Sequence, residues 1–442
     1  MVTKQLVKRI LNTNYEDLPD RVIEHAKKSL LNWLGVTIGA IDHETIDILM
    51  DVIQENNQST EVTVLGRNRK TDLLSAVLIN GTSSHIFDFD DTHLPTIHHP
   101  SGPVAPVVFA LGEKYHFSPK ALIHAFIIGC ETELRISNAI YPSHYQLGYH
   151  ITGSTGAFGA AAAASVLLNL DEDRTAMALG IAGTQSFGLR EMFGTMTKSF
   201  HPGKAAQNGL LAALLAQKGF TSSQQVIEAK RGFANVYSPE RDLTQILDKW
   251  GEVWEFEKNA FKPYACGIVL HPAIDACIKL SEIAKPEDVK EIILNVHPYV
   301  LELTAKENPQ TGLEGKFSIY HAAAIAFLEK DASEAQFKED KVLAPQTIDF
   351  RKKIRPVVNE NIAKDMVKAT LKTYKGFSHN VTIEHATGSL ENPMTQQMIN
   401  RKFTKLCQEH LQIEAIQELI NKMMNLENVP SLTDVLSIIN NN

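Results

Sequence analysis

The chain has 442 residues, with 43 Lys and Arg against 51 Asp and Glu, a formal net charge of −8 and 44% hydrophobic residues. This length allows a large core, and the mildly acidic balance argues against nucleic-acid binding through bulk electrostatics. No stretch approaches the ~20 apolar residues of a membrane span, so we expect no membrane partner.

Helical periodicity dominates the first ~260 residues. Several predicted helices follow residues that cap or start helices well. The predicted starts are Asp20, Leu73 after Asp72, Pro119 after Ser118, Ala157, Glu172 after Asp171, and Gly203.

The pattern changes after roughly residue 260, where alternation over 291–297, 369–371 and 381–384 predicts strands. A helix is predicted over 320–328, and the helical pattern returns from Arg401. We therefore expect a mainly α protein. A large all-helical domain would span residues 1–260 and 396–442, and a smaller α+β lid domain over 261–395 would be inserted before the C-terminal helices.

The four cysteines are scattered and form no CxxC pair: Cys130, Cys266, Cys277 and Cys407. Their spacing disfavours a zinc ribbon or a redox motif and is typical of a reducing compartment. The charged, amphipathic N-terminal segment lacks the apolar core and cleavage site of a signal peptide. We therefore expect a cytoplasmic protein.

The common nucleotide and hydrolase motifs are missing from the sequence. There is no G-x-G-x-x-G after a strand, no G-x-x-x-x-G-K-[ST], no G-x-S-x-G and no H-E-x-x-H. Dinucleotide-binding, P-loop, α/β-hydrolase and zincin interpretations therefore lose support.

An acidic segment carries the first candidate chemistry. Asp88, Asp90 and Asp91 lie within four residues and are followed by His98 and His99. The carboxylates could gather a divalent metal, or one of them could orient a histidine for acid–base work. They could equally cap a helix end.

Two further segments place cationic side chains at predicted helix starts. His150 precedes a Gly- and Thr-rich start, and Lys198 and His201 precede Gly203. Backbone N–H groups at such starts suit an anionic ligand. The ordinary alternatives are a packed turn and a surface lysine.

Two candidates lie in the second half of the chain. Lys262 lies where the helical pattern ends and the predicted α+β segment begins. Small-molecule sites are common at such domain junctions; the alternative is an ordinary linker. Tyr320 is either a packing aromatic or a hydrogen-bond donor to a substrate.

Taken together and in this order, these segments resemble the MmgE/PrpD family. The matching positions run along nearly the whole chain: Asn80-Gly81-Thr82, His85, Asp88 to Thr92, His99 to Gly102, His150, Gly156, Thr197-Lys198, His201, Gly203, Lys262-Pro263-Tyr264, Phe317-Ser318, Tyr320, Asn392 to Thr395 and Lys402-Phe403.

The resemblance implies a homodimer, a site between the helical domain and the lid, and neither metal nor organic cofactor. It also implies a pocket formed by seven residues: Asp88, Thr92, His99, His150, Lys198, Lys262 and Tyr320. Of these, Asp88 would orient a histidine and Thr92 would bind substrate. We expect His98 and His201 to contact the substrate as well.

This set suits a small polycarboxylate, because lysines and protonated histidines offset its charge and a histidine can move a proton at carbon. The resemblance favours a lyase like cis-aconitate decarboxylase, which forms itaconate and CO2. The alternatives are a 2-methylcitrate dehydratase and an iminodisuccinate-type epimerase.

Two departures from the decarboxylase pattern keep these alternatives open. The chain has His98-His99 where one histidine is expected, and Gly267 stands where the animal decarboxylases are expected to carry a histidine. Two other classes are a non-catalytic, carboxylate-binding helical dimer and a metal-dependent prenyl-type enzyme. The second requires a further aspartate-rich motif at a distance, and Asp171-Glu172-Asp173 lies too near.

Overall fold

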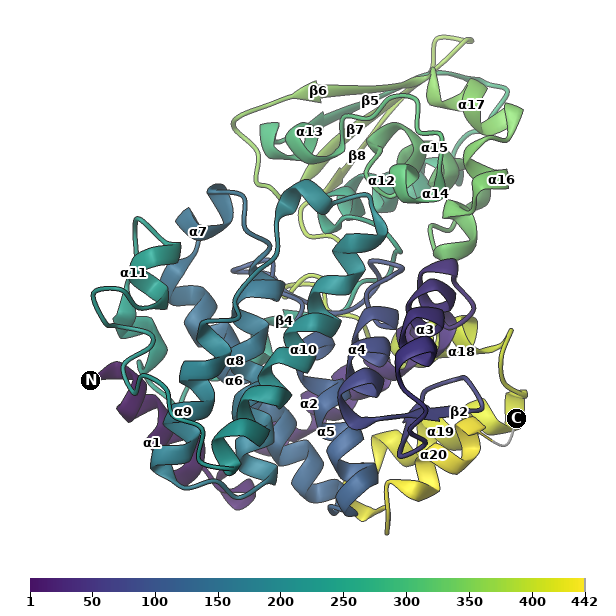
Figure 1. The fold of residues 1–442 in the computed structure, drawn as a ribbon. Helices are drawn as coiled ribbons and strands as arrows, with labels where there is room; N and C mark the ends of the chain where they lie inside the picture. The colour runs from purple at the N-terminus through teal and green to yellow at the C-terminus, as the bar shows by residue number, and fades with distance from the viewer. Residues whose placement is uncertain (441–442) are drawn as a thin grey trace. The chain divides into compact units, whose positions relative to one another are not determined.

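The computed structural model describes residues 1–440, which form two compact units. Unit 1 comprises Met1–Ile86, Asp90–Ala260 and Gln396–Asn442, and unit 2 comprises Phe87–Phe89 and Phe261–Thr395. The prediction of a mainly α protein is confirmed (Figure 1). Among the described helices, none combines the length and the apolar character needed to cross a membrane.

Unit 1 is built mainly of helices. The longer ones are α1 (Val2–Asn12), α2 (Asp20–Gly39), α3 (Glu44–Asn56), α4 (Leu73–Ser83), α5 (Ser101–Tyr115), α6 (Pro119–Ile140), α8 (Ile151–Leu167), α9 (Glu172–Gly183), α10 (Met196–Gln217), α18 (Gln396–Cys407), α19 (Ile413–Met424) and α20 (Thr433–Asn440).

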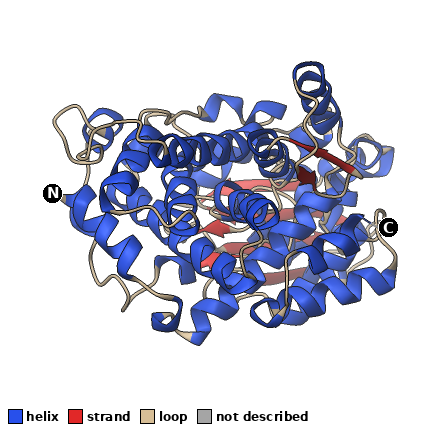
Figure 2. Cartoon of the chain, turned by 60° about the horizontal axis from the view of Figure 1, so that its bottom comes forward, coloured by secondary structure: helices blue, strands red, loops and turns tan. Residues whose placement is uncertain are grey.

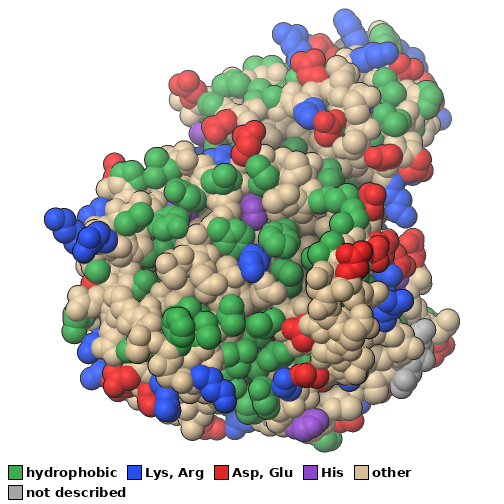
Figure 3. Space-filling model, in the orientation of Figure 1, with side chains coloured by type: hydrophobic (Ala, Val, Ile, Leu, Met, Phe, Trp, Pro, Cys, Tyr) green, Lys and Arg blue, Asp and Glu red, His purple; other side chains and the backbone are tan. Residues whose placement is uncertain are grey.

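Helix α8 lies at the centre of unit 1, between α6 and α10 (Figure 1). All of its residues except Val166 are buried, and most are Ala, Gly, Ser or Thr. A helix that is apolar or small on every side is typical of a core position, where neighbouring helices approach closely. Figure 3 shows hydrophobic side chains gathered over the middle of the visible face of this unit, with most of the charged side chains nearer its margins.

Unit 1 also contains two short antiparallel strand pairs, so the expectation of an all-helical domain was wrong in detail. Strand β1 (Val62–Val64) pairs with β2 (Arg69–Thr71), and β3 (Thr92–His93) pairs with β4 (Asn259–Ala260). The second pair matters for the site, because it holds the loop before Thr92 against a distant segment.

Three predicted helix bounds were also wrong. Helix α8 begins at Ile151 rather than Ala157, and α10 begins at Met196, with Pro202 and Gly203 inside it. The helical pattern predicted from Arg401 is two helices, α18 and α19, separated by residues 408–412. Buried helices lack the polar-to-apolar periodicity that marks a start, which explains the first two errors.

Unit 2 contains a four-stranded sheet in the order β6-β5-β7-β8 (Figure 2). The strands are β5 (Val289–Val296), β6 (Ile354–Val358), β7 (Val367–Thr373) and β8 (Ser378–Ile383). Strands β5 and β6 are parallel, and the other neighbours are antiparallel. Helix α12 (His271–Ser281) packs on β7 and β8, and α15 (Ile319–Glu329) packs on α12 and β6. Alternate residues of β5 are buried, as expected for a sheet with one covered face.

Candidate active site

Unit 1 gathers four histidines that come from separate parts of the chain. His85 follows α4, His99 lies just before α5, His150 is the residue before the first turn of α8, and His201 lies in α10. All four are buried, with no more than 4% of their surface exposed. We refer to His85, His99, His150 and His201 as the histidine cluster.

His85 is oriented by a buried carboxylate. Its Nδ1 atom lies 2.7 Å from Oδ2 of Asp90, and both side chains are fully buried. An ionised carboxylate only accepts hydrogen bonds, so Nδ1 of His85 carries the proton of this bond, and Nε2 is the nitrogen that can take up or release a second proton. Nε2 is itself buried and has no hydrogen-bond partner among the described residues.

His99 has the same tautomer for a similar reason. Its Nδ1 atom donates to the backbone carbonyl of Asp91 at 2.8 Å, and it lies 3.6 Å from Asp90 Oδ2 and 3.3 Å from the Thr92 hydroxyl. The His99 ring packs against His85 with 4.6 Å between ring centroids. A carbonyl cannot donate, so Nδ1 of His99 carries the proton of this bond, and Nε2 is again the nitrogen that can exchange a second proton.

The other two histidines are hydrogen-bonded to each other, with 2.8 Å between their Nδ1 atoms. Burial, the neighbouring histidines and the Lys198 charge hold the pKa of His150 well below its ordinary value. Burial, His85 and Lys198 lower the pKa of His201 to about 4. Both rings are therefore neutral near pH 7, and a bound anion would make their protonation easier.

Lys198 supplies the positive charge beside this pair. It lies three residues before His201 on α10, so the two side chains share a face of the helix. Lys198 is 8% exposed, and its ammonium lies 5.2 Å from the centroid of the Phe193 ring. A buried cation next to neutral histidines can hold a carboxylate of a ligand.

Close backbone packing fixes α4 and α10 against each other. A Cβ atom on Gly81 would lie 2.6 Å from Cα of Gly203, and one on Gly203 would lie 2.4 Å from the carbonyl oxygen of Leu78. Both distances are too short for a real side chain, so glycine is required at both positions. This contact sets the separation between His85, which follows α4, and the Lys198 and His201 side chains on α10.

Two further acids are buried close to the cluster. Burial and the neighbouring Asp90 charge raise the pKa of Asp91 to about 6, while Ser101 and Asn259 donate hydrogen bonds to it. Burial, with a smaller effect of Asp91, raises the pKa of Glu133 well above its ordinary value. The His98 ring faces Glu133, with 3.9 Å between Nδ1 and Oε1. His98 therefore lies against a buried acid, whereas its sequence neighbour His99 joins the cluster.

Unit 2 holds the other predicted residues. Lys262 donates from Nζ to both the backbone carbonyl and Oδ1 of Asp88, each at 2.9 Å, and both side chains are buried. Lys316, which is also buried, donates to the backbone carbonyl of Phe87 and pairs with Glu334. Two buried lysines thus hold the Phe87–Phe89 segment within unit 2.

Tyr320 lies on α15 of the same unit, and its hydroxyl donates to Glu307 at 3.3 Å. Burial and the Glu307 carboxylate raise its pKa, so the hydroxyl keeps its proton at neutral pH. It is available as a donor and not as a base.

The structure brings together several residues that the sequence singled out, namely Thr92, His99, His150, Lys198 and His201 in unit 1, and Asp88 with Lys262 in unit 2. Sequence reasoning missed the roles of His85 and Asp90. The available signal was their spacing, since a histidine and an aspartate five residues apart flank the tightly turned Asp88, whose φ is 51°.

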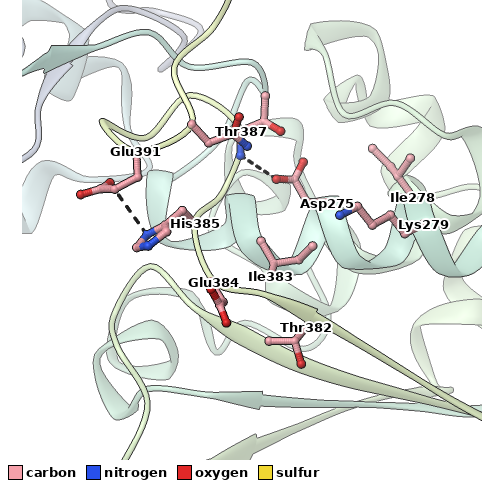
Figure 4. Close-up of a pocket in the computed structure, with 10 residues that line it drawn as sticks. Asp275, Ile278, Lys279, Thr382, Ile383, Glu384, His385, Thr387 and Glu391 are labelled. Atoms are coloured by element: carbon pink, nitrogen blue, oxygen red, sulfur yellow. Dashed lines mark hydrogen bonds and ion pairs between the residues drawn. The ribbon is translucent and has the colours of Figure 1, made fainter.

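Among the described residues, several groups of side chains are spaced for a metal ion. In one of them the ring nitrogens of His85, His99 and His150 lie within 4.8 Å of one another, and in another the ligand atoms of Asp365, His385 and Glu391 do so on the surface of unit 2. His385 and Glu391 also line a cavity of about 490 Å³ (Figure 4). None of the predicted site residues lines that cavity, so it is separate from the histidine cluster.

The chain is similar to known proteins over nearly its whole length. The chain is 27% identical to the cis-aconitate decarboxylase of Aspergillus terreus (strain NIH 2624 / FGSC A1156), covering 99% of this chain and 96% of that protein. It is also 27% identical to the cis-aconitate decarboxylases of Homo sapiens, covering 97% and 92%, and Mus musculus, covering 98% and 93%. The MmgE/PrpD N-terminal domain matches residues 4–246, and the MmgE/PrpD C-terminal domain matches residues 264–427. The chain therefore belongs to the MmgE/PrpD family.

Proposed function

We propose that this protein is a lyase that transfers a proton to or from carbon in a small polycarboxylate, and that cis-aconitate is its substrate. The observation that carries the proposal is the buried histidine cluster, which places proton-transferring rings beside the Asp90 carboxylate and the Lys198 cation. The names of the relatives supply the choice of substrate.

Decarboxylation of cis-aconitate needs a place for an electron pair and a source of one proton. The bond from the methylene carbon to its carboxylate breaks, CO2 leaves, and the electron pair shifts through the alkene to the former vinylic CH carbon. A proton added there gives itaconate. A cation held at the remaining carboxylates stabilises the negative charge that develops in the transition state.

His99 is suited to deliver that proton from Nε2. Its Nδ1 atom is already bonded to the Asp91 carbonyl and lies near Asp90, and both groups favour the positively charged ring. The His150–His201 pair provides a second exchange site, because its two rings can pass a proton between them. Lys198 would bind a substrate carboxylate.

The roles of Lys262, Asp88 and Tyr320 follow from the resemblance and belong to the proposal. Lys262 would add a second cation, and Tyr320 would donate a hydrogen bond from its neutral hydroxyl. We propose further that the protein acts as a homodimer in the cytoplasm and needs no cofactor, because proton transfer and charge stabilisation suffice for this reaction.

Gly267 supports a related reaction of the same family as the second candidate function. A Cβ at this position would meet nothing closer than the Lys316 carbonyl oxygen, at 3.7 Å, so the backbone accepts a side chain there. Crowding at Cβ therefore does not explain why glycine stands where a decarboxylase is expected to carry a histidine. Dehydration of 2-methylcitrate or epimerisation of a C4 dicarboxylate would use the same histidine cluster on a different bond.

The test is proton NMR of the chelator-treated protein in D2O with cis-aconitate, 2-methylcitrate and iminodisuccinate, each alone. We expect itaconate with one deuterium at the methylene carbon next to its carboxylate. Turnover of another acid with cis-aconitate untouched would assign a sister activity, and Gly267→His would then be tested for gain of itaconate formation. No reaction with any of the three would reject the proposal.

A further inference from the structure

The histidine cluster has a property that acid–base chemistry does not require. His85, His99 and His150 each place a ring nitrogen within 4.8 Å of the other two, and all three rings are at least 95% buried. Three imidazoles around one point, with a fourth position left open, are the protein ligands of many zinc sites. Zn–N bonds are about 2.1 Å long, so tetrahedral ligand atoms lie about 3.4 Å apart, and side-chain rotations of modest size would close the difference.

The hydrogen bonds of these rings favour metal binding. The Asp90 carboxylate takes the Nδ1 proton of His85, and the Asp91 carbonyl takes that of His99, so both rings present the Nε2 lone pair. Carboxylates and carbonyls that hold the far nitrogen of a histidine are the usual supports of zinc ligands, because they fix the tautomer and raise the basicity of the ring.

A second observation points to a ligand at the same place. His85 Nε2 is buried and has no hydrogen-bond partner among the described residues. A buried polar atom without a partner costs free energy, and bound water or a metal ion would remove that cost.

We propose that His85, His99 and His150 form a three-histidine site for Zn²⁺. Zinc is favoured over magnesium or calcium, because those ions prefer oxygen ligands. The ion occupies the nitrogens that would otherwise exchange protons with substrate. Zn²⁺ therefore inhibits turnover and a chelator restores it, a consequence that rests on the proposed function.

The binding test does not depend on catalysis. Metal-free protein is titrated with Zn²⁺ against a chromophoric chelator, and Co²⁺ is then added as a spectroscopic probe. We expect one tight equivalent per chain and the intense visible absorption of tetrahedral Co²⁺. His85→Gln should weaken binding at least ~10-fold, and Asp90→Asn should weaken it ~10-fold or more by removing the support of His85.

The surface group of Asp365, His385 and Glu391 provides the matched control. Figure 4 shows His385 and Glu391 of this group. His385→Ala should leave the tight equivalent and the Co²⁺ spectrum unchanged. Loss of tight binding in His385→Ala, with His85→Gln unaffected, would overturn the proposal. So would the absence of tight binding in the unaltered protein, a measurement that needs no variant to fold.

Inhibition is measured separately, with free Zn²⁺ fixed by a metal buffer because polycarboxylates themselves bind zinc. Turnover should fall as the titrated site fills. Tight binding without any turnover in metal-free protein would reject the proposed function and keep the zinc site. Turnover that is unaffected while the site is filled would overturn the inhibitory role, because His99 and His150 would then be dispensable for proton transfer.

Discussion

Asp90 Oδ2 lies 2.7 Å from His85 Nδ1 in a part of unit 1 where both side chains are fully buried. This pair fixes the tautomer of His85 and lies beside His99, and it therefore sets the protonation pattern of the cluster. Asp90→Asn should lower kcat by ~10² or more, because an amide can donate to Nδ1 and move the ring proton to Nε2. KM should change much less, since the substituted group does not bind substrate.

The Asp90 prediction is checked by 15N NMR of labelled histidine together with steady-state kinetics. A tautomer change at His85 accompanied by loss of kcat supports a positioning role. Unchanged histidine signals with the same loss of kcat would contradict it. Asp365→Asn, at a half-exposed surface position, is the control for a general effect of removing a carboxylate.

Replacement of His99 or His150 tests the proton transfer itself. His99→Ala or His150→Ala should each reduce itaconate formation by at least ~10², which is the usual contribution of a general acid or base. Circular dichroism should show an unchanged helix content, and His385→Ala should retain activity. Retained turnover in both cluster variants would remove the acid–base assignment.

Lys198 should act mainly through substrate charge. Lys198→Ala is expected to raise KM strongly, because it removes a cation that binds the ground state and the transition state alike. Lys198→Arg should recover part of the affinity, since the charge is kept while the shape of the head group changes. A variant with normal KM would show that the substrate carboxylates bind elsewhere.

Lys262 and Asp88 should be strongly coupled in stability. Lys262→Met removes the buried ammonium that donates to the backbone carbonyl and to Oδ1 of Asp88, and it should cost about 3–5 kcal/mol, as is typical of breaking a buried ion pair. Adding Asp88→Asn should recover part of that loss. Urea unfolding of the two single variants and the double variant measures the coupling, and strictly additive losses would contradict it.

Buried neutral histidines away from the cluster predict an acid-labile fold. Burial lowers the pKa of His25, His144 and His321 from 6.5 to about 4. Below pH 6.5 the unfolded chain binds protons that the folded chain does not, so stability is full above pH 6.5 and falls as the pH drops towards 4. Each group should account for about 2 kcal/mol of lost stability between pH 7 and pH 5.

Urea midpoints at the two pH values measure this loss. His321→Gln keeps a donor for the Gln336 carbonyl. It should reduce the pH-dependent loss of stability by the contribution of one histidine. His116→Asn, at an exposed position with φ of 56°, should leave it unchanged. An equal pH dependence in His321→Gln and the unaltered protein would contradict the assignment.

Helix starts with a capping residue could be predicted from the sequence. The Asp72, Ser118 and Asp171 side chains each accept a hydrogen bond from the first turn of the following helix, at the predicted places. The starts of α8 and α10 could not, because both are buried on most sides and α10 continues through Pro202. Their bounds are set by packing, which sequence periodicity does not report.

The residues of the candidate site also fall into those that the sequence could predict and those that it could not. His99 and His150 are each followed by a segment rich in small residues, which is a local signal. His85 and Asp90 gain their relationship only when the chain turns at Asp88 and the intervening residues are held in unit 2 by Lys262 and Lys316. A contact that depends on distant lysines has no local signature, and the acidic segment alone left several interpretations open.

The contact between Gly81 and Gly203 limits how this protein can be engineered. Because the two backbones touch, any side chain at either position would push α4 and α10 apart and separate His85 from Lys198 and His201. Libraries of variants should therefore leave both glycines unchanged and vary positions where a Cβ atom makes only ordinary contacts, of which Gly267 is one. Such changes leave the spacing between the two helices unaltered.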